Sequence, residues 1–202
     1  YLVATRDARL FLVATDAPGL SREALVSIDR TRRLGELRFD NVAAEWLPGS
    51  EDVHHARTLI AHGRVMHAAD TLGAAQAMLD QAVAYAGTRE QFGRVIASFQ
   101  AVKHLCAEMA AALEPSRALV WYAAHALSTL PAEAELYACH AKAHVAEVGS
   151  FIARTATEVH GGMGFTDLLG LHYWFKRIGL NRQLLGSPER AREEAARLQG
   201  LC

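Results

Sequence analysis

The sequence predicts an α+β fold that is mainly α, with a fragment of an antiparallel β-domain followed by a C-terminal four-helix up-down bundle. Residues 1–47 hold four short apolar segments separated by turn formers, whereas the chain turns alanine-rich with helical periodicity from about residue 52. A chain of 202 residues with 51% hydrophobic residues can bury a core and is not of the disordered class. We expect a β-region over residues 1–50 and a helical bundle over residues 51–202.

The first region is expected to form strands at residues 1–5, 9–15, 24–28 and 34–39. Leu37 and Phe39 alternate with charged residues, which is the period of two of a half-buried antiparallel strand. Turn-forming residues separate the segments. Four strands that start abruptly at Tyr1 do not complete a barrel or sandwich, so we expect this region to be the C-terminal part of a larger β-domain whose earlier residues precede Tyr1.

Four long helical segments are expected at residues 53–86, 99–130, 131–159 and 168–184. Pro115 should kink the second segment, and Pro131 suits the first position of the third. Breaks are expected at residues 87–93 and at a glycine-rich loop at residues 160–164. Ser187 and Pro188 then resemble the cap and first residue of a short last helix.

The amino-acid composition excludes some classes of function. The 21 basic and 22 acidic residues give a net charge of −1, so no overall positive field exists for nucleic acid or anionic lipid. The three cysteines form neither a disulfide framework nor a Cys-x-x-Cys metal motif, which fits a reducing, cytoplasmic compartment. No apolar run has the length of a membrane span, and no signal peptide is visible.

Histidines raise the question of a metal site. His140 and His144 lie one helical turn apart, as metal ligands can. The residues between them supply no further ligand, and the sequence places no third one. We therefore interpret these histidines as surface or interface residues and expect no metal.

The segment Tyr85-Ala-Gly-Thr-Arg-Glu-Gln-Phe-Gly93 ends one helix and turns toward the next. An arginine beside an exposed phenylalanine can clamp a phosphate and stack on a base. In the alternative interpretation, Arg89 caps helix carbonyls and Phe92 fills the core between helices.

The segment His160-Gly-Gly-Met-Gly164 follows the end of the third helix. Its glycines allow the backbone to approach a ligand closely and expose amide groups to an anion. The alternative is an ordinary glycine C-cap and turn.

Taken together, these segments resemble the C-terminal half of the acyl-CoA dehydrogenase flavoprotein family. That family has an R-x-x-F-G turn, an F-Q pair on the next helix and a later Q-x-x-G-G-x-G-F, which stand here as Arg89…Phe92-Gly93, Phe99-Gln100 and residues 158–165. The resemblance covers essentially the whole chain. It implies α,β-dehydrogenation of an acyl-CoA thioester with FAD as hydride acceptor, a homo- or hetero-tetramer, and an electron-transfer protein as candidate acceptor.

The resemblance also implies cofactor contacts. Arg89 and Phe92 would hold the pyrophosphate and adenine of a neighbouring subunit's FAD, and the glycine amides would contact its AMP end. A carboxylate stands where the family has glutamine, and it would repel a pyrophosphate unless protonated or paired with a cation such as Arg154. The strand that binds isoalloxazine is expected upstream of Tyr1. The implied cofactor-binding set is Arg89, Gln91, Phe92, Gln100, Glu158, Gly161 and Gly162.

The implied reaction needs a carboxylate that removes the α-proton. The family places it late in the bundle, at the position of Leu185, or in a minority at the position of Gly63, just before Arg64, which is assigned to substrate binding. Neither Leu185 nor Gly63 accepts a proton. We expect this chain to be the base-lacking subunit of a heteromeric enzyme whose partner supplies a glutamate. Glu189 is the alternative base, although an acid at a helix start is the preferred interpretation.

Two further functions stay open on the same residues. One is a non-redox interaction or scaffold protein that kept the bundle and lost flavin. The other is a DNA-associated flavoprotein branch of the fold, against which the net charge of −1 and the lack of a basic C-terminal stretch argue. A visible absorption spectrum separates a flavoprotein from a scaffold.

Overall fold

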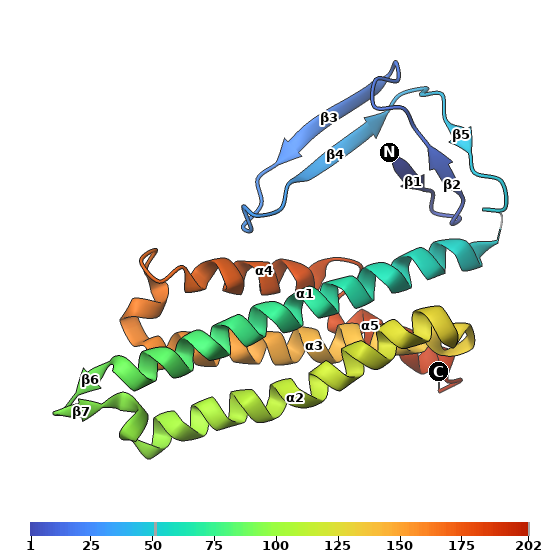
Figure 1. Cartoon of the computed structure of the whole chain (residues 1–202). Coiled ribbons are helices and arrows are strands. Elements are labelled where there is room, and N and C mark those ends of the chain that lie inside the picture. The colour runs from blue at the N-terminus through green and yellow to red at the C-terminus, as the bar shows by residue number, and fades with distance from the viewer. Residues whose placement is uncertain (51, 202) are drawn as a thin grey trace. The chain divides into compact units, whose positions relative to one another are not determined.

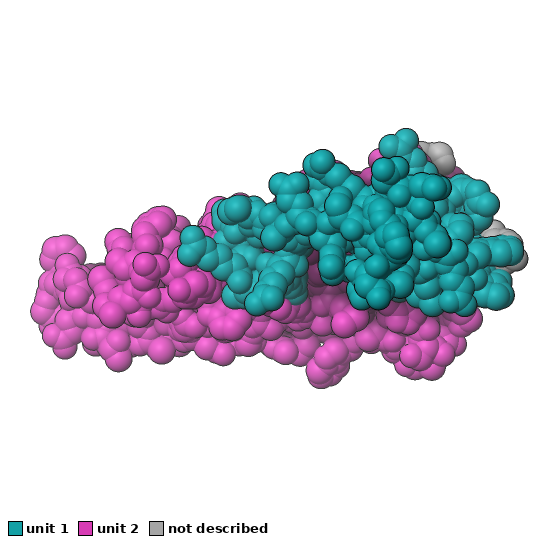
Figure 2. Space-filling model, turned by 90° about the horizontal axis from the view of Figure 1, so that it is seen from above, with its two compact units in different colours: residues 1–60 teal, residues 61–202 magenta. Residues whose placement is uncertain are grey.

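The computed structural model describes residues 1–50 and 52–201. It divides into two compact units, residues 1–60 and residues 61–202, which are coloured separately in Figure 2. The division falls inside the first long helix, whereas composition places it at residue 50.

The first unit holds small antiparallel sheets. Strands β1 (Leu2–Ala4), β2 (Leu10–Leu12) and β5 (Glu45–Trp46) form one sheet in the order β1-β2-β5, and β3 (Leu20–Leu25) pairs with β4 (Leu34–Phe39) in another. The expected strand at residues 24–28 is wrong, because β3 begins at residue 20 and pairs along the whole of β4. Ser50 ties the segment after β5 to β2: its hydroxyl accepts from Trp46 Nε1 at 2.9 Å and from the Leu10 amide at 3.3 Å.

The rest of the chain is a helical bundle, as the sequence predicts (Figure 1). Two short strands, β6 (Glu90–Gln91) and β7 (Arg94–Val95), and the 3₁₀ turn η1 (Ile96–Ser98) connect the first two helices. The predicted loop after the third helix is instead a 3₁₀ turn, η2 (Gly161–Phe165). The helices are α1 (Val53–Thr88), α2 (Gln100–Thr129), α3 (Pro131–His160), α4 (Leu171–Gln183) and α5 (Pro188–Leu198).

Two helix boundaries follow from local geometry. Helix α4 begins at residue 171 rather than 168, because Gly170 adopts a left-handed conformation with φ +64° that interrupts helical geometry. Helix α5 begins as predicted, with the Ser187 hydroxyl accepting from the Arg190 amide at 3.4 Å. Helix α2 continues as one element through Pro115.

The core of the bundle combines many alanines with a few large side chains. Met78, Met109, Leu113, Ile152 and Ile178 are fully buried. Helix α3 packs against α2, α4 and α5 and so forms the centre of the bundle. Small residues let these helices approach closely, because their side chains add little width between the axes.

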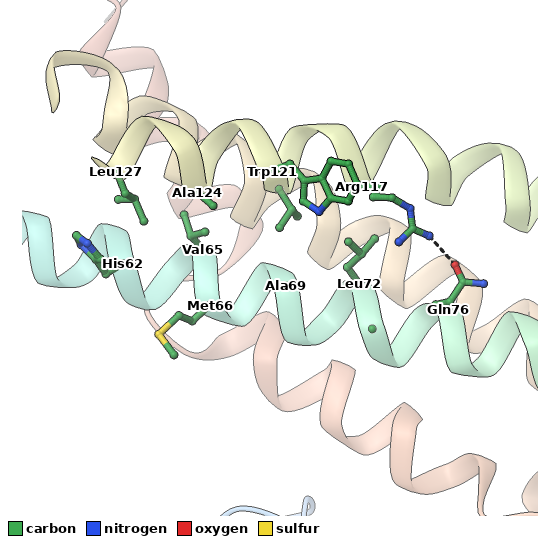
Figure 3. Close-up of a pocket in the computed structure, with 12 residues that line it drawn as sticks. His62, Val65, Met66, Ala69, Leu72, Gln76, Arg117, Trp121, Ala124 and Leu127 are labelled. Atoms are coloured by element: carbon green, nitrogen blue, oxygen red, sulfur yellow. Dashed lines mark hydrogen bonds between the residues drawn. The ribbon is translucent and has the colours of Figure 1, made fainter. Parts of the chain in front are cut away.

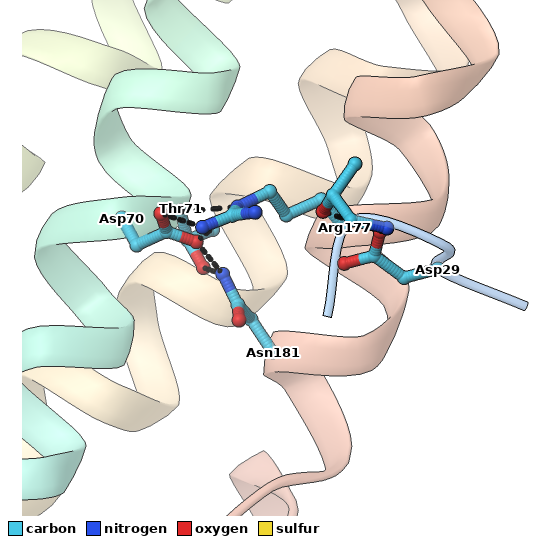
Figure 4. A network of polar contacts seen from close by, with 6 residues as sticks. Asp29, Asp70, Thr71, Arg177 and Asn181 are labelled. Carbon is cyan, nitrogen blue, oxygen red and sulfur yellow. Dashed lines mark hydrogen bonds and ion pairs between the residues drawn. The ribbon is translucent and has the colours of Figure 1, made fainter. Parts of the chain in front are cut away.

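A polar network joins α1 to α4 (Figure 4). The Arg177 guanidinium donates to both oxygens of Asp70, at 2.9 Å from Nε and 2.8 Å from Nη2. The Asn181 amide nitrogen donates to the same carboxylate at 2.6 Å and to the Thr71 hydroxyl at 3.0 Å. A two-armed arginine–carboxylate contact has a defined geometry and therefore fixes the register of α4 on α1.

Gly149→Ala is expected to lower the free energy of unfolding by about 1–2 kcal/mol, although alanine favours helices. A Cβ on Gly149 would lie 2.5 Å from the Thr71 Cγ2 methyl and 3.3 Å from that of Ile178. Thr71→Ser removes the first methyl but keeps the hydroxyl that Asn181 needs, so it should restore stability in the double variant. Urea denaturation measures the free energy of unfolding of the single and the double variant. As a control, Gly179→Ala, where a Cβ meets nothing within 4 Å, should not destabilise; equal losses in both variants would contradict the packing argument.

Candidate functional site

The break between α1 and α2 is a β-hairpin with a two-residue turn. Glu90 pairs with Val95 and Gln91 with Arg94, and the turn residues Phe92 and Gly93 have φ angles of +55° and +75°. Positive φ at both central residues is the turn geometry that matches strand twist, but phenylalanine is an unusual occupant of it. Phe92 is 91% exposed, so the interpretation that it fills the core is wrong.

The hairpin presents an aromatic and cationic surface. Phe92 lies edge-on to Phe99 with the ring centres 6.1 Å apart, and the Arg94 guanidinium lies 4.0 Å above the Phe99 ring. Arg94 was not singled out from the sequence, although its place directly after the Arg89–Gly93 motif is a signal for it.

The polar residues that were expected to contact the cofactor in this region lie at the surface. Arg89, Gln91 and Gln100 are all exposed. The Gln91 amide donates to the Glu90 carbonyl at 2.8 Å, and Gln100 Nε2 lies 3.1 Å from His104 Nε2. These side chains are therefore accessible to a ligand or a partner at this end of the bundle.

The structure brings the glycine motif next to the hairpin motif. The buried His160 ring stacks on Tyr85, with ring centres 4.6 Å apart, and its Nδ1 lies 2.7 Å from the Ala156 carbonyl oxygen. The Tyr85 carbonyl in turn accepts from the Arg89 amide at 2.8 Å. The two motifs thus meet through one aromatic contact.

The glycines of this segment have different roles. Gly161 is the C-cap of α3, with φ +57° and ψ −140°, so a glycine does end the helix, but outside the left-handed helical region of an ordinary glycine C-cap. A Cβ on Gly164 would lie 2.9 Å from the Thr157 carbonyl oxygen, so this glycine is required by packing. A Cβ on Gly161 or Gly162 would meet nothing within 4 Å. No packing contact within the described residues requires Gly162, which leaves room for a group from outside this chain.

An open groove of about 470 Å³ runs beside these glycines. It is lined by Arg154, Thr157, Glu158, Gly161, Phe165 and Phe175. Arg154 and Glu158 lie one helical turn apart on α3, and both are exposed. A cation and a carboxylate therefore face the same groove.

The two positions implied for the base lie in contact, although they are far apart in sequence. A Cβ on Gly63 of α1 would lie only 2.3 Å from the Cδ1 atom of Leu185. Leu185 sits in the connection between α4 and α5 with φ +57°, an uncommon conformation for a residue other than glycine. The leucine side chain therefore occupies the space over Gly63, and neither residue carries a carboxylate.

Arg64 is buried beside this contact and is only 4% exposed. Its Nε donates to the Leu185 carbonyl at 3.0 Å, its Nη1 to Cys139 Sγ at 3.0 Å, and its Nη2 to a Glu194 oxygen at 2.7 Å. Burial alone disfavours the charge, but the Glu194 carboxylate raises the pKa of Arg64 overall. The predicted substrate-binding guanidinium is thus engaged with this chain's own groups.

A second buried cation lies at the C-terminal end of α4. Lys142 of α3 is 2% exposed, and its ammonium donates to the carbonyls of Asn181 and Arg182 at the end of α4. A cation at a helix C-terminus satisfies carbonyls that have no partner within the helix. Burial, together with Arg64 and Arg182, lowers the pKa of Lys142 to about 8. Burial raises the pKa of the neighbouring Cys139 thiol to about 11, so this thiol is protonated at neutral pH.

Glu189, the alternative base, is held in an exposed ion pair. Its carboxylate lies 2.9 Å from Arg182 Nη2, and its side chain is 63% exposed. The Ser187 hydroxyl, the backbone and Arg182 together lower the pKa of Glu189 to about 2. A carboxylate with such a low pKa is a weak proton acceptor.

Helices α1 and α2 enclose an apolar groove of about 640 Å³ (Figure 3). Met66 and Trp121 flank it and are 72% and 68% exposed, while Arg117 donates to Gln76 at 2.8 Å at one end. An exposed apolar surface of this kind is typical of a protein–protein or ligand interface.

The described residues contain no group of three or more histidine, cysteine or acidic side chains placed to hold a metal ion. Within residues 1–50 and 52–201, no helix is long and apolar enough to cross a membrane.

The hairpin, the glycine turn and the bundle define a helical domain of a known class, and comparison identifies that class. The family model for the acyl-CoA dehydrogenase C-terminal domain matches residues 53–199. The chain belongs to the acyl-CoA dehydrogenase family.

Individual relatives agree with this assignment. The chain is 36% identical to the acyl-CoA dehydrogenase IpdE2 of Mycobacterium tuberculosis over 180 residues, which cover 89% of this chain and 51% of that protein. It matches the structure of the ChsE4-ChsE5 complex from Mycobacterium tuberculosis with a TM-score of 0.86 and 27% identity, over 100% of this chain and 55% of that one. A structure described as the Tcur3481-Tcur3483 steroid ACAD matches with a TM-score of 0.87 and 29% identity, over 98% and 54%. The chain spans about half the length of these relatives.

Proposed function

We propose that this chain is part of an FAD-dependent acyl-CoA dehydrogenase and serves as the subunit that lacks the catalytic base. The observation that carries the proposal is the contact between Gly63 and Leu185, because the two positions implied for the base share one space and an apolar side chain fills it. The relatives named above support the reaction class, and two of them are described by paired names, ChsE4-ChsE5 and Tcur3481-Tcur3483. By analogy with these pairs, we propose that the present chain also assembles with a second, different subunit.

The residues of the hairpin and the glycine turn are suited to FAD. Arg89 offers a charge-assisted contact for a pyrophosphate, and the exposed Phe92 ring offers a stacking surface for adenine. The open space over Gly161 and Gly162 lets their backbone approach a ligand, and their amides can donate to its oxygens. Bound FAD supplies the hydride acceptor for the β-hydrogen of the acyl thioester.

Glu158 is the unfavourable member of this set, since an ionised carboxylate repels a pyrophosphate. Arg154 lines the same groove one helical turn away, so its charge can offset that of Glu158. We propose that the groove accepts the AMP end of the cofactor with this pair side by side.

Association with other subunits completes the proposal. The groove between α1 and α2, with its exposed Met66 and Trp121, gives the bundle an apolar surface that a tetramer would cover. An acyl-CoA thioester is the proposed substrate, and an electron-transfer protein is the proposed acceptor.

Arg89→Ala is expected to lower the flavin content of the purified protein, because it removes a charge-assisted contact worth about 1.5–3 kcal/mol, roughly a 10- to 100-fold loss of affinity. Flavin per protein is measured from the visible absorption spectrum, with the partner co-expressed. Arg197→Ala, which alters an exposed ion pair with Glu193 on α5, is the control and should leave the flavin content unchanged. Equal flavin in the wild type and the Arg89 variant would contradict the assignment.

The same spectrum separates the proposal from its rival. A scaffold protein that has lost flavin would show no flavin absorption either alone or with its partner. The exposed Glu158 carboxylate favours this second candidate.

A further inference from the structure

The ends of α1 and α3 meet at one buried histidine. His160 is the last residue of α3 and is 5% exposed. Its ring stacks on that of Tyr85, near the end of α1, with the ring centres 4.6 Å apart and the ring planes at 28°. Two flat rings in such an arrangement attract each other and favour one relative orientation. The contact therefore joins two helix ends that lie far apart in the sequence.

A hydrogen bond fixes the orientation of the histidine ring. Its Nδ1 atom lies 2.7 Å from the Ala156 carbonyl oxygen, one helical turn earlier in α3. A carbonyl oxygen only accepts, so Nδ1 carries the proton and donates it to this bond. The ring cannot rotate without breaking the bond, and the bond therefore holds it at the angle at which it contacts Tyr85.

A segment with candidate ligand contacts follows directly on each side of this stacked pair. On the α1 side, the Tyr85 carbonyl accepts from the Arg89 amide at 2.8 Å, which ties the start of the hairpin to the same residue. On the α3 side, η2 folds back over His160, because a Cβ on Gly164 would lie only 3.1 Å from the His160 Cβ. The stacked pair therefore supports both the hairpin and the glycine turn.

We propose that His160 is a positioning residue that presents the hairpin and the glycine turn to one ligand as a single surface. The hairpin and the amides of Gly161 and Gly162 can contact the same molecule only while the two helix ends keep a fixed distance. An aliphatic side chain at position 160 would fill the space but would not hold that distance, since it makes neither the stack nor the hydrogen bond. That the ligand is FAD rests on the proposed function, whereas the coupling of the two segments does not.

The affinity for FAD, measured on the full-length protein with its partner, tests the role of His160. His160→Leu is expected to weaken binding by about 2- to 10-fold, the range of an aromatic contact. Its Tm should stay within a few degrees of the wild type, because leucine fills the buried site without adding a polar group. His160→Phe keeps a flat ring and should recover most of the lost affinity. Equal losses in the two variants would contradict a role for the ring.

Tyr137→Leu is the matched control, because it removes another aromatic contact between helices. The ring of Tyr137 in α3 lies 4.4 Å from that of Tyr122 in α2, measured between ring centres. This variant should lower the Tm and leave the affinity for FAD unchanged. A loss of affinity as large as that of His160→Leu would show that general stability, and not positioning, is being measured.

Hydrogen exchange tests the coupling without any ligand. In His160→Leu, the amides of residues 86–95 should exchange about 2- to 10-fold faster, although the substitution lies in α3. Tyr85→Leu should have the same effect on residues 161–166, and the double variant should add little to either single variant. Unchanged exchange across the contact in both variants would overturn the proposal.

The Arg89→Ala variant separates this proposal from the proposed function. Loss of FAD affinity in Arg89→Ala but not in His160→Leu would show that the hairpin binds FAD without being positioned by His160. Unchanged affinity in both variants would contradict FAD binding at this surface and would leave the exchange result standing.

Discussion

Acyl-CoA added to the full-length protein expressed alone is expected to reduce its flavin on the order of 10²–10⁴-fold more slowly than with a glutamate-bearing partner subunit. The reason is that α-proton removal needs a carboxylate over the substrate, and in the proposed function the position implied for that carboxylate is held by Leu185, which lies against Gly63. The measurement is the loss of visible flavin absorption after mixing with a set of straight-chain, branched and steroid side-chain acyl-CoA thioesters.

Glu189 is not expected to replace the missing base. Its ion pair with Arg182 and its pKa of about 2 make it a poor proton acceptor. Glu189→Gln should therefore leave the rate of flavin reduction unchanged in the assembly with the partner. A partner in which the catalytic glutamate is changed to glutamine serves as the control and should abolish the fast rate. Fast reduction by this protein alone, lost in Glu189→Gln, would show that the base lies in this chain.

Glu194→Gln is expected to lower the free energy of unfolding by about 2–3 kcal/mol, because it leaves the buried Arg64 guanidinium without its carboxylate. The loss should fall below that of a fully buried pair, since the Glu194 side chain is 30% exposed. The neighbouring Glu193→Gln is the matched control: its partner Arg197 is exposed, and such pairs contribute about 0–1 kcal/mol. Equal losses in the two variants would contradict a special role for the Arg64 pair.

The difference in the free energy of unfolding between the wild type and Glu194→Gln is expected to depend on pH in a defined direction. The hydrogen bond from Arg64 lowers the pKa of Glu194 in the folded state below its ordinary value of 4.5. The ionised carboxylate therefore stabilises the fold above about pH 4.5, and this contribution is lost as the pH falls through the lowered pKa. The difference between wild type and Glu194→Gln should be full at pH 7 and shrink below pH 4.5. Urea denaturation at several pH values measures it.

The sequence by itself determined the helices and indicated the family. Alanine-rich periodicity marked the helices, Pro131 and Ser187 marked two helix starts, and the Arg89–Gly93 segment marked the break between α1 and α2. These signals are local, because helix periodicity and capping act within a few residues. They also carried the motifs on which the family resemblance rests.

Some local expectations failed where pairing or backbone geometry overrode composition. Strand β3 begins at Leu20 rather than Ala24, because its register on β4 is set by hydrogen bonds to a strand farther along the chain. The loop after His160 closes into a 3₁₀ turn. Of the two interpretations of Phe92, the core-filling one is wrong, because two turn residues with positive φ direct the ring into solvent.

Only the tertiary structure decided how the site is assembled. It stacks His160 on Tyr85 and so joins the two motifs, it places Leu185 over Gly63, and it surrounds Arg64 with groups from α3, α5 and the connection before α5. None of these contacts follows from spacing along the chain, because they depend on the angles and distances at which separate helices pack. The sequence identified the two positions without a carboxylate, and packing made them a single space that one leucine closes.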